Sequence, residues 1–201
     1  MFEDYASIFS RRGAAYDAAM CRFPEARQQE FDAILRLAKP QAGETLIDLP
    51  AGGGYLHGYL DTNAIRLIAV EPSPAFYRLC RDRVRESHLA PLNKLPLPDA
   101  QADVAVSLAG LHHEAERLPI FHEVFRVLRP GGRFAIAEVA VDSAPARFLN
   151  KFVHQHNPNG HVGLFADGGF QADLLAAGFI LVDDPILDYH WQFRSLRNMA
   201  E

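Results

Sequence analysis

The chain has 201 residues, of which 49% are hydrophobic and 22% are charged, and its formal net charge is −5. This length and apolar content suit one domain with a sizeable core, so no second domain is required. The negative balance and the dispersed basic residues give no broad phosphate-binding face, so we expect no nucleic-acid partner.

Cysteine usage and hydropathy bear on where the protein works. Cys21 and Cys80 have neither the spacing of a metal site nor the number needed for a disulfide framework. No stretch is typical of a signal peptide or of an apolar membrane span. The sequence therefore predicts a cytoplasmic protein without a membrane partner, acting as a monomer or a homodimer.

The first forty residues are predicted to be helical. Apolar residues recur at helical spacing over 24–39, Pro24 suits a first helical turn, and Pro40 ends the run. Ahead of it lies an aromatic arm that is either a packing helix or a lid over a ligand. The apolar residues of this arm are Phe2, Tyr5, Ile8, Phe9 and Tyr16.

A glycine-rich loop follows the first apolar run. Residues 45–49 read as a buried strand, and 50–54 form a tight loop after it. A second apolar run, 67–70, leads to Glu71. Neighbouring parallel strands end at the same edge of an α/β sheet, so loop and carboxylate should form a nucleoside pocket, with Glu71 accepting hydrogen bonds from ribose hydroxyls.

The glycine spacing restricts the nucleoside. A dinucleotide fingerprint, G-x-G-x-x-G, needs a third glycine where this chain has His57, and no G-x-x-x-x-G-K-[ST] phosphate loop occurs. The sequence therefore favours a ligand that contains adenosine but no phosphates.

The remaining elements follow in chain order. A helix capped by Ser73 should be followed by a strand whose end brings 108–113 into the cleft, and then by a helix with Phe121 and Phe125 facing inward. Between 142 and 167 we expect part helix and part long loop. The expected helices are 73–86, 118–128 and 169–178, and the expected strands are 104–107, 133–139, 179–182 and 189–193.

Several ordered motifs resemble one family. The run Leu-Ile-Asp-Leu-Pro-Ala-Gly-Gly-Gly at 46–54 resembles the D-x-G-x-G-x-G motif of class I S-adenosylmethionine-dependent methyltransferases. Segments 71–73, 95–104, 108–113 and 125–132 are similar to later motifs of the family, best matched by its small members that include ubiquinone-biosynthesis enzymes. The resemblance covers about residues 30 to 183.

This resemblance implies an α/β fold: a Rossmann-like, seven-stranded, mostly parallel sheet with helices on both faces. One methyltransferase domain would span 1–201, with an N-terminal helical arm or lid at 1–40, a cofactor-binding core at 41–141 and a substrate-side half at 142–201. The implied cofactor is S-adenosylmethionine, with S-adenosylhomocysteine as the product.

The resemblance also carries over a cofactor site. Asp48 would brace the loop, and Gly52 and Gly54 would lie under the amino-acid portion of the cofactor. Pro50 replaces the usual first glycine and removes an N–H, which is tolerated if that position needs neither a positive φ nor a donor. The predicted cofactor-binding residues are Asp48, Pro50, Ala51, Gly52, Gly54, Glu71, Pro72, Ser73, Asn93, Lys94, Leu95 and Leu108.

On the adenine side, Pro91 falls near the usual position of an aspartate that accepts the adenine amino group. Asn93 could substitute for it, because an amide side chain offers both an acceptor and a donor.

Methyl transfer from a sulfonium is an in-line displacement, so the protein mainly aligns the reacting atoms and excludes water, and a base is optional. His112 and His113 are the candidates for acceptor contact and proton removal, against the alternative that they bond only to local backbone. Tyr16 is the candidate that covers the sulfonium.

A second group of histidines, His154, His156 and His161, raises the question of a metal site. No acidic or cysteine ligand sits among them, and methyl transfer needs no metal, so we predict no metal site and interpret them as surface or substrate-pocket histidines.

The predicted function is methyl transfer from S-adenosylmethionine to a small organic acceptor, at an O, N, S or C atom. An alternative is a cofactor-binding accessory protein with the same fold and little or no turnover. A third hypothesis is a sulfonium-dependent enzyme with a different chemistry, because fold does not fix reaction.

Overall fold

The structure is a computed structural model that describes residues 5–156, 160–161, 163–188 and 190–200. Its strands are β1 (Thr45–Asp48), β2 (Arg66–Glu71), β3 (Glu86–Leu89), β4 (Ala102–Leu108) and β5 (Leu128–Ala137). They form one parallel sheet of five strands in the order β3-β2-β1-β4-β5. The chain moves outward from β1 to one edge and then to the other, so the order reverses at β1 and β4, where open α/β sheets bind ligands.

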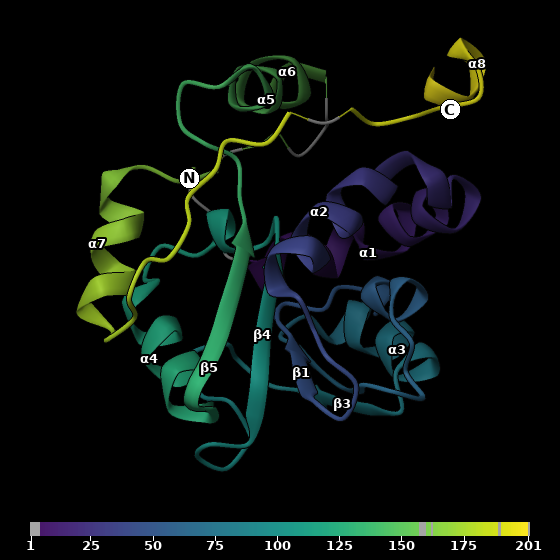
Figure 1. Cartoon of the computed structure of the whole chain (residues 1–201). Helices are drawn as coiled ribbons and strands as arrows, with labels where there is room; N and C mark the ends of the chain where they lie inside the picture. The colour runs from purple at the N-terminus through teal and green to yellow at the C-terminus, as the bar shows by residue number, and fades with distance from the viewer. Residues whose placement is uncertain (1–4, 157–159, 162, 189, 201) are drawn as a thin grey trace.

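Helices cover both faces of this sheet. They are α1 (Tyr5–Arg22), η1 (Pro24–Arg27), α2 (Gln28–Ala38), η2 (Tyr55–Tyr59), α3 (Pro74–Arg83), η3 (Leu111–His113), α4 (Leu118–Val127), α5 (Ala144–Arg147), η4 (Phe148–Val153), α6 (His154–His156), α7 (Gly168–Ala176) and α8 (Leu196–Ala200). Figure 1 shows α4 and α7 on the left of the sheet and α1, α2 and α3 on the right. The expected arm, the helix after Pro24 and the helix capped by Ser73 are confirmed.

The core is divided into two layers by the alternation of side chains along each strand. On β1, Ile47 faces a cluster that contains Phe121 of α4 and Phe170 of α7. Its neighbour Leu46 faces the opposite cluster, with Phe31 of α2. Because both faces are buried there, the central strands β1, β2 and β4 are largely apolar, and the carboxyl edge of the sheet is left for a ligand.

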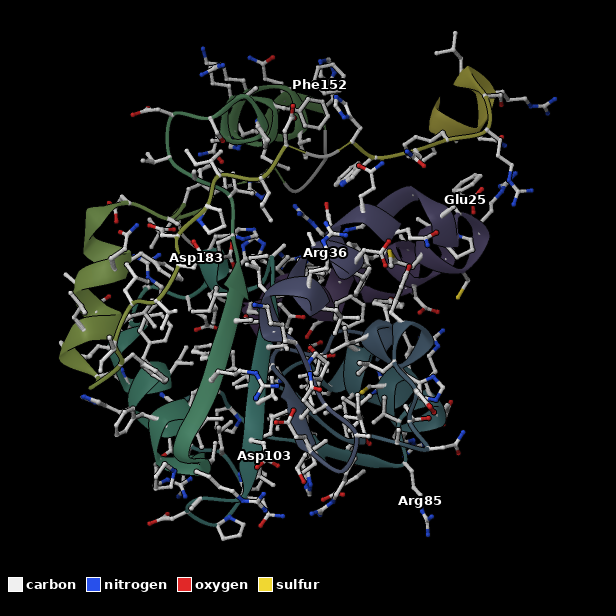
Figure 2. All side chains as sticks on the ribbon, in the orientation of Figure 1. Glu25, Arg36, Arg85, Asp103, Phe152 and Asp183 are labelled. Atoms are coloured by element: carbon white, nitrogen blue, oxygen red, sulfur yellow. The ribbon has the colours of Figure 1, made fainter. Side chains whose placement is uncertain are left out.

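The carboxyl edge points toward α5 and α6. In Figure 1 the arrowhead of β5 ends below these helices, and Figure 2 labels Phe152 there and Asp103 at the opposite end of the sheet. No helix within the described ranges is long and apolar enough to cross a membrane.

The expected seven strands are not confirmed, because the described residues form five. Residues 179–182 and 190–193 pair with no strand, and Tyr189 lies outside the described residues. Ile180 and Val182 are 86% and 93% exposed. An apolar run becomes a strand only when a partner supplies its hydrogen bonds. Here Phe179 packs against Phe134 of β5, with ring centroids 5.7 Å apart, but the run pairs with no strand in the described part of the chain.

Two local expectations were also wrong. The third helix ends at Arg83, and β3 begins at Glu86, because parallel pairing with β2 overrides its polar sequence. Phe125 is 47% exposed instead of fully inward, since its ring meets Phe179 at the rim of the core, with centroids 5.2 Å apart.

Candidate functional site

The loop after β1 is held by the two strands that flank it. Leu49 N–H donates to the Val106 carbonyl at 3.0 Å, and Ala51 N–H donates to the Val70 carbonyl at 3.0 Å. Pro50 lies between these two donors, so its missing N–H leaves the loop anchored on both sides.

Pro50 is accommodated by a glycine on the next strand connection. A Cβ added at Gly110 would lie 2.3 Å from Pro50 Cγ, which no real contact allows. Pro50, which replaces the usual first glycine of the motif, therefore fits because residue 110 has no side chain.

The glycines of the loop are needed for its shape. Gly52 and Gly54 have φ of +57° and +79°, in the left-handed region that L side chains avoid. A Cβ at Gly54 would also approach Val84 Cγ2 at 3.0 Å and Cys80 Sγ at 3.2 Å. The loop can therefore pass close to α3 and turn its N–H groups toward the end of β2.

Glu71 meets this loop, as the sequence predicted. Gly52 N–H donates to Glu71 Oε2 at 2.7 Å, and Ser73 N–H donates to Oε1 at 2.7 Å. Burial raises the pKa of Glu71 to about 8, although these two N–H groups lower it. Burial also raises the pKa of Asp48 to about 8. Two carboxyl groups in this apolar surrounding would gain from a cationic ligand.

Helix α1 lies over the pocket. Tyr5 Oη donates to Glu71 Oε2 at 3.3 Å, on the oxygen that also accepts from Gly52. The Phe9 ring packs between Tyr5 and Phe76, at centroid distances of 4.5 and 4.8 Å. The remaining cavity is about 50 Å³, whereas a small-molecule pocket takes roughly 300–1,000 Å³. The aromatic arm therefore fills much of the space that a nucleoside would need.

Tyr16 belongs to the same helix and lines the same cavity. Its hydroxyl group accepts a hydrogen bond from Arg27 Nη1. The adjacent Asp17 carboxylate accepts from Arg83 Nη1 at 2.7 Å and from Tyr55 Oη at 2.9 Å. These contacts tie α1 to α3 and to the glycine loop.

The predicted cofactor residues divide into two groups. Those that line the cavity are Asp48, Pro50, Ala51, Gly52 and Leu108. The other seven do not line it, and among them Glu71 and Gly54 make the contacts with the loop and with α3 described above. Pro72 is half-buried, and Ser73 caps α3 with its hydroxyl. Asn93 and Lys94 are exposed on a turn, and Leu95 N–H donates to Glu123 Oε2 at 2.7 Å. The adenine-side assignments therefore remain predictions.

A histidine cluster lies beside the cavity. We use this name for His112, His113 and His161, which are all buried. Their ring centroids are 4.1 Å apart for His112 and His113, 5.7 Å for His112 and His161, and 5.5 Å for His113 and His161. The Phe9 ring of α1 lies 5.8 Å from His113.

This arrangement differs from the predicted grouping of His161 with His154 and His156. His156 is exposed on α6. His154 Nδ1 lies 2.8 Å from the carbonyl oxygen and 3.1 Å from the backbone nitrogen of His161, so its hydrogen bonds to His161 are with the backbone of that residue.

Each histidine of the cluster has a different environment. His112 Nδ1 lies 2.8 Å from Glu138 Oε2, and His161 Nδ1 lies 3.0 Å from Asn150 Oδ1. His113 Nδ1 is buried without a hydrogen-bond partner in the described part of the chain. Burial lowers the pKa of His113 to about 2 and that of His161 to about 4, so both are neutral at pH 7. His112, oriented by a carboxylate, is the best placed of the three to accept a proton.

Comparison with known proteins agrees with this geometry. Residues 47–136 match the family model described as "Methyltransferase domain". The chain is 30% identical over 141 residues to a malonyl-[acyl-carrier protein] O-methyltransferase of Serratia marcescens, covering 69% of this chain and 53% of that protein. It is 31% identical over 122 residues to a ubiquinone/menaquinone biosynthesis C-methyltransferase UbiE of Rubrivivax gelatinosus, covering 59% and 47%.

Residues 47–136 therefore match a methyltransferase domain, and the chain is similar to class I S-adenosylmethionine-dependent methyltransferases. The cofactor of this family is S-adenosylmethionine. A solved SAM-dependent methyltransferase from Thermotoga maritima shares the fold, with a TM-score of 0.74 at 21% identity over 88% of this chain and 82% of that one. The chain spans about half the length of the curated relatives it matches.

Four residues of the candidate site were not predicted to act there: Tyr5, Phe9, Glu138 and Asn150. Tyr5 and Phe9 were predicted only as part of an apolar arm that could act as a lid, and nothing in their spacing singled them out, rather than Tyr16, as the residues beside Glu71. Glu138 follows directly after β5, which ends at Ala137. An acid at the carboxyl end of a strand beside β4 was a usable signal, because β4 delivers His112 to the same edge.

Proposed function

We propose that this methyltransferase transfers the methyl group of S-adenosylmethionine to a small organic acceptor by in-line displacement. The observation that carries the proposal is the 2.7 Å contact between Gly52 N–H and the Glu71 carboxylate. In this arrangement the ribose hydroxyls donate to Glu71, and the amino-acid portion of the cofactor lies along the glycine loop. The positive charge of the sulfonium then stabilises the ionised forms of Glu71 and Asp48. This offsets part of the free energy that ionising these two buried acids requires.

The acceptor side is proposed to be the histidine cluster. His112 and His113 follow β4 directly, beside the loop that carries Pro50, so an acceptor placed against them would face the cofactor methyl. The side chain of His112 is held by Glu138, which leaves its other ring nitrogen with a lone pair that accepts a proton or binds a cation. The proposal covers oxygen, nitrogen, sulfur and carbon acceptor atoms.

Cofactor entry requires α1 to move. Tyr5 donates its hydroxyl hydrogen to the carboxylate oxygen that the ribose would use, and Phe9 fills the adjoining space. We therefore assign α1 the role of a lid that exchanges the Tyr5 hydroxyl for a ribose hydroxyl when the cofactor binds. Tyr16, which lines the cavity, would then lie on the bound cofactor as the sequence predicted.

The alternative of an accessory protein has one observation in its favour. A cavity of about 50 Å³ under an aromatic helix leaves little room for a methyl acceptor beside the cofactor. The two functions share cofactor binding and differ in turnover, which can be measured.

Calorimetric titration with S-adenosylmethionine and S-adenosylhomocysteine tests binding, and a methyl-transfer assay with a panel of phenols, thiols, amines and carboxylates tests turnover. We expect one cofactor per chain and transfer to at least one class. Glu71→Gln should weaken binding, while Asp82→Asn, an exposed position on α3, should not. Tight binding with no transfer to any class would favour the accessory function, and no binding would refute both.

A further inference from the structure

We propose that His112, His113 and His161 bind one divalent transition-metal ion of the zinc class, with one coordination position left open. One ring nitrogen of each residue lies within 4.8 Å of those of the other two. Tetrahedral zinc with Zn–N bonds of about 2.0–2.1 Å places its ligand atoms about 3.3 Å apart. The rings therefore need to approach by at most roughly 1.5 Å, which a side-chain adjustment of His161 on its loop can supply.

The outer contacts of two histidines are those of metal ligands. His112 Nδ1 donates to Glu138 Oε2 at 2.8 Å, because a carboxylate can only accept. His161 Nδ1 donates to Asn150 Oδ1 at 3.0 Å, and Gly163 N–H approaches the same oxygen at 3.4 Å, which identifies it as the acceptor. In both rings Nε2 is left with a free lone pair. A ligating histidine is oriented in this way by a carboxylate or an amide oxygen.

The third histidine supplies an independent observation. His113 is 4% exposed, and its Nδ1 has no hydrogen-bond partner within the described ranges of the chain. A buried nitrogen without a partner destabilises the folded state unless a ligand uses the group. Packing alone therefore does not explain three buried imidazoles that face one another.

A glycine makes room for the cluster. A Cβ at Gly163 would lie 3.0 Å from His112 Cδ2 and 3.1 Å from His161 Cε1. Only a residue without a side chain allows the backbone to pass this close to both rings.

The charges around the cluster indicate what the open position would bind. Glu138 contributes one negative charge, and Arg12 contributes one positive charge where it donates to the carbonyl of Gly160, next to His161. A dication on three neutral imidazoles then leaves a net positive site that favours an anionic oxygen, as in a phenolate, an enolate or a carboxylate. Phe9 and Tyr5, which line the cofactor cavity, have ring centroids 5.8 and 6.4 Å from that of His113. This acceptor class rests on the proposed methyl transfer, whereas the metal site does not.

Metal binding is tested on the full chain, purified without a polyhistidine tag and stripped with a chelator. Zn²⁺ is titrated against a chromophoric chelator, and Co²⁺ is added to read coordination from its visible spectrum. We expect one equivalent of Zn²⁺ and the absorption of four-coordinate cobalt. His161→Gln should lower zinc affinity at least about 100-fold, and Glu138→Gln, which keeps all three ligands, should lower it about 10- to 100-fold.

His156→Gln is the matched control, because this exposed histidine lies outside the cluster, and it should leave zinc affinity unchanged. Circular dichroism checks that each variant is folded. The proposal is overturned if the wild-type chain binds no stoichiometric zinc, or if His161→Gln and Glu138→Gln both keep wild-type affinity. Separate titration with S-adenosylhomocysteine distinguishes the two proposals: cofactor binding without zinc refutes only the metal site, and zinc binding without cofactor refutes only the methyltransferase function.

Discussion

The two sides of the site are built in different ways. The cofactor edge, by which we mean the loop 50–54 with Glu71, comes from two strands adjacent in the sequence, and backbone N–H groups make its contacts. The histidine cluster joins η3 to a distant segment, and the side chains of Glu138 and Asn150 orient it. The first depends on glycines and one acid, whereas the second depends on partners far away in the chain. Substitutions at the cofactor edge should therefore change cofactor affinity, whereas substitutions in the histidine cluster should change turnover.

The largest effect is expected on the histidine side. His112→Ala removes the ring that Glu138 orients, so turnover at saturating cofactor should fall about 10²- to 10⁴-fold. Affinity for S-adenosylhomocysteine should stay unchanged, because the ring does not line the cofactor cavity. His122→Ala, at an exposed position of α4, is the control in the same steady-state assay. Full turnover in the His112 variant would remove this residue from the reaction.

The second-largest effect is expected at the cofactor edge. Glu71→Ala removes the acceptor of the ribose hydroxyls and of two backbone N–H groups. Cofactor affinity should fall by about 1–3 kcal/mol, or about 5- to 150-fold in Kd, as measured by calorimetry. Wild-type affinity in this variant would place the ribose elsewhere.

Backbone packing at the cofactor edge can be tested through stability. Gly110→Ala drives a methyl group into the Pro50 ring and should lower the free energy of unfolding by about 1–3 kcal/mol. Pro50→Ala in the same chain should recover part of this loss. Gly58→Ala is the matched control, because a Cβ there meets nothing within 4 Å. Denaturant unfolding measures all four chains, and equal stability of the two single glycine variants would refute the contact.

Cofactor affinity should rise with pH up to about pH 8. Burial raises the pKa of Glu71 to about 8, and ribose hydroxyls bind best to its ionised form. At lower pH, binding must also ionise this group, so affinity should decrease about tenfold for each pH unit. Calorimetry across this range measures the slope, which Glu71→Gln should reduce to the part contributed by Asp48, whose pKa burial also raises to about 8.

The same pKa shift acts on stability in the opposite direction. The ordinary value for this carboxyl group is 4.5 and the folded value is about 8. Between them the folded state keeps a proton that the unfolded state releases, so the free energy of unfolding should fall as pH rises through this window. Glu71→Gln should flatten this fall in urea titrations of the cofactor-free chain, and an unchanged slope would contradict the assignment.

The smallest effect concerns the lid. Tyr5→Phe removes the hydroxyl that occupies Glu71, so cofactor affinity should increase by about 0.5–1.5 kcal/mol, or about 2- to 12-fold. Tyr77→Phe on α3 should change nothing. Weaker binding by the Tyr5 variant would mean that Tyr5 contacts the bound cofactor instead of competing with it.

Sequence predicted the cofactor edge better than the histidine cluster, for a physical reason. An apolar run, a glycine-rich loop and an acid after the next apolar run are local features of the sequence. They are enough to predict β1, the loop and the position of Glu71. The position of His161 depends on Asn150 and on a chain segment that returns to η3. No sequence pattern in either segment predicts that His161 lies beside η3.

The same limit explains the strands that did not form. Residues 179–182 are as apolar as 67–70. The run 67–70 has β1 and β3 on its two sides, whereas 179–182 has no paired neighbour among the described residues. Local pattern predicts the tendency to extend, whereas pairing depends on the rest of the fold.

The central claim is that Glu71 and the glycine loop bind the adenosyl group of the cofactor. A crystal structure with S-adenosylhomocysteine tests it most directly. The claim predicts both ribose hydroxyls within hydrogen-bond distance of the Glu71 carboxylate, with the Tyr5 hydroxyl displaced from it. A structure in which Tyr5 stays on Glu71 while the ligand lies elsewhere would contradict it.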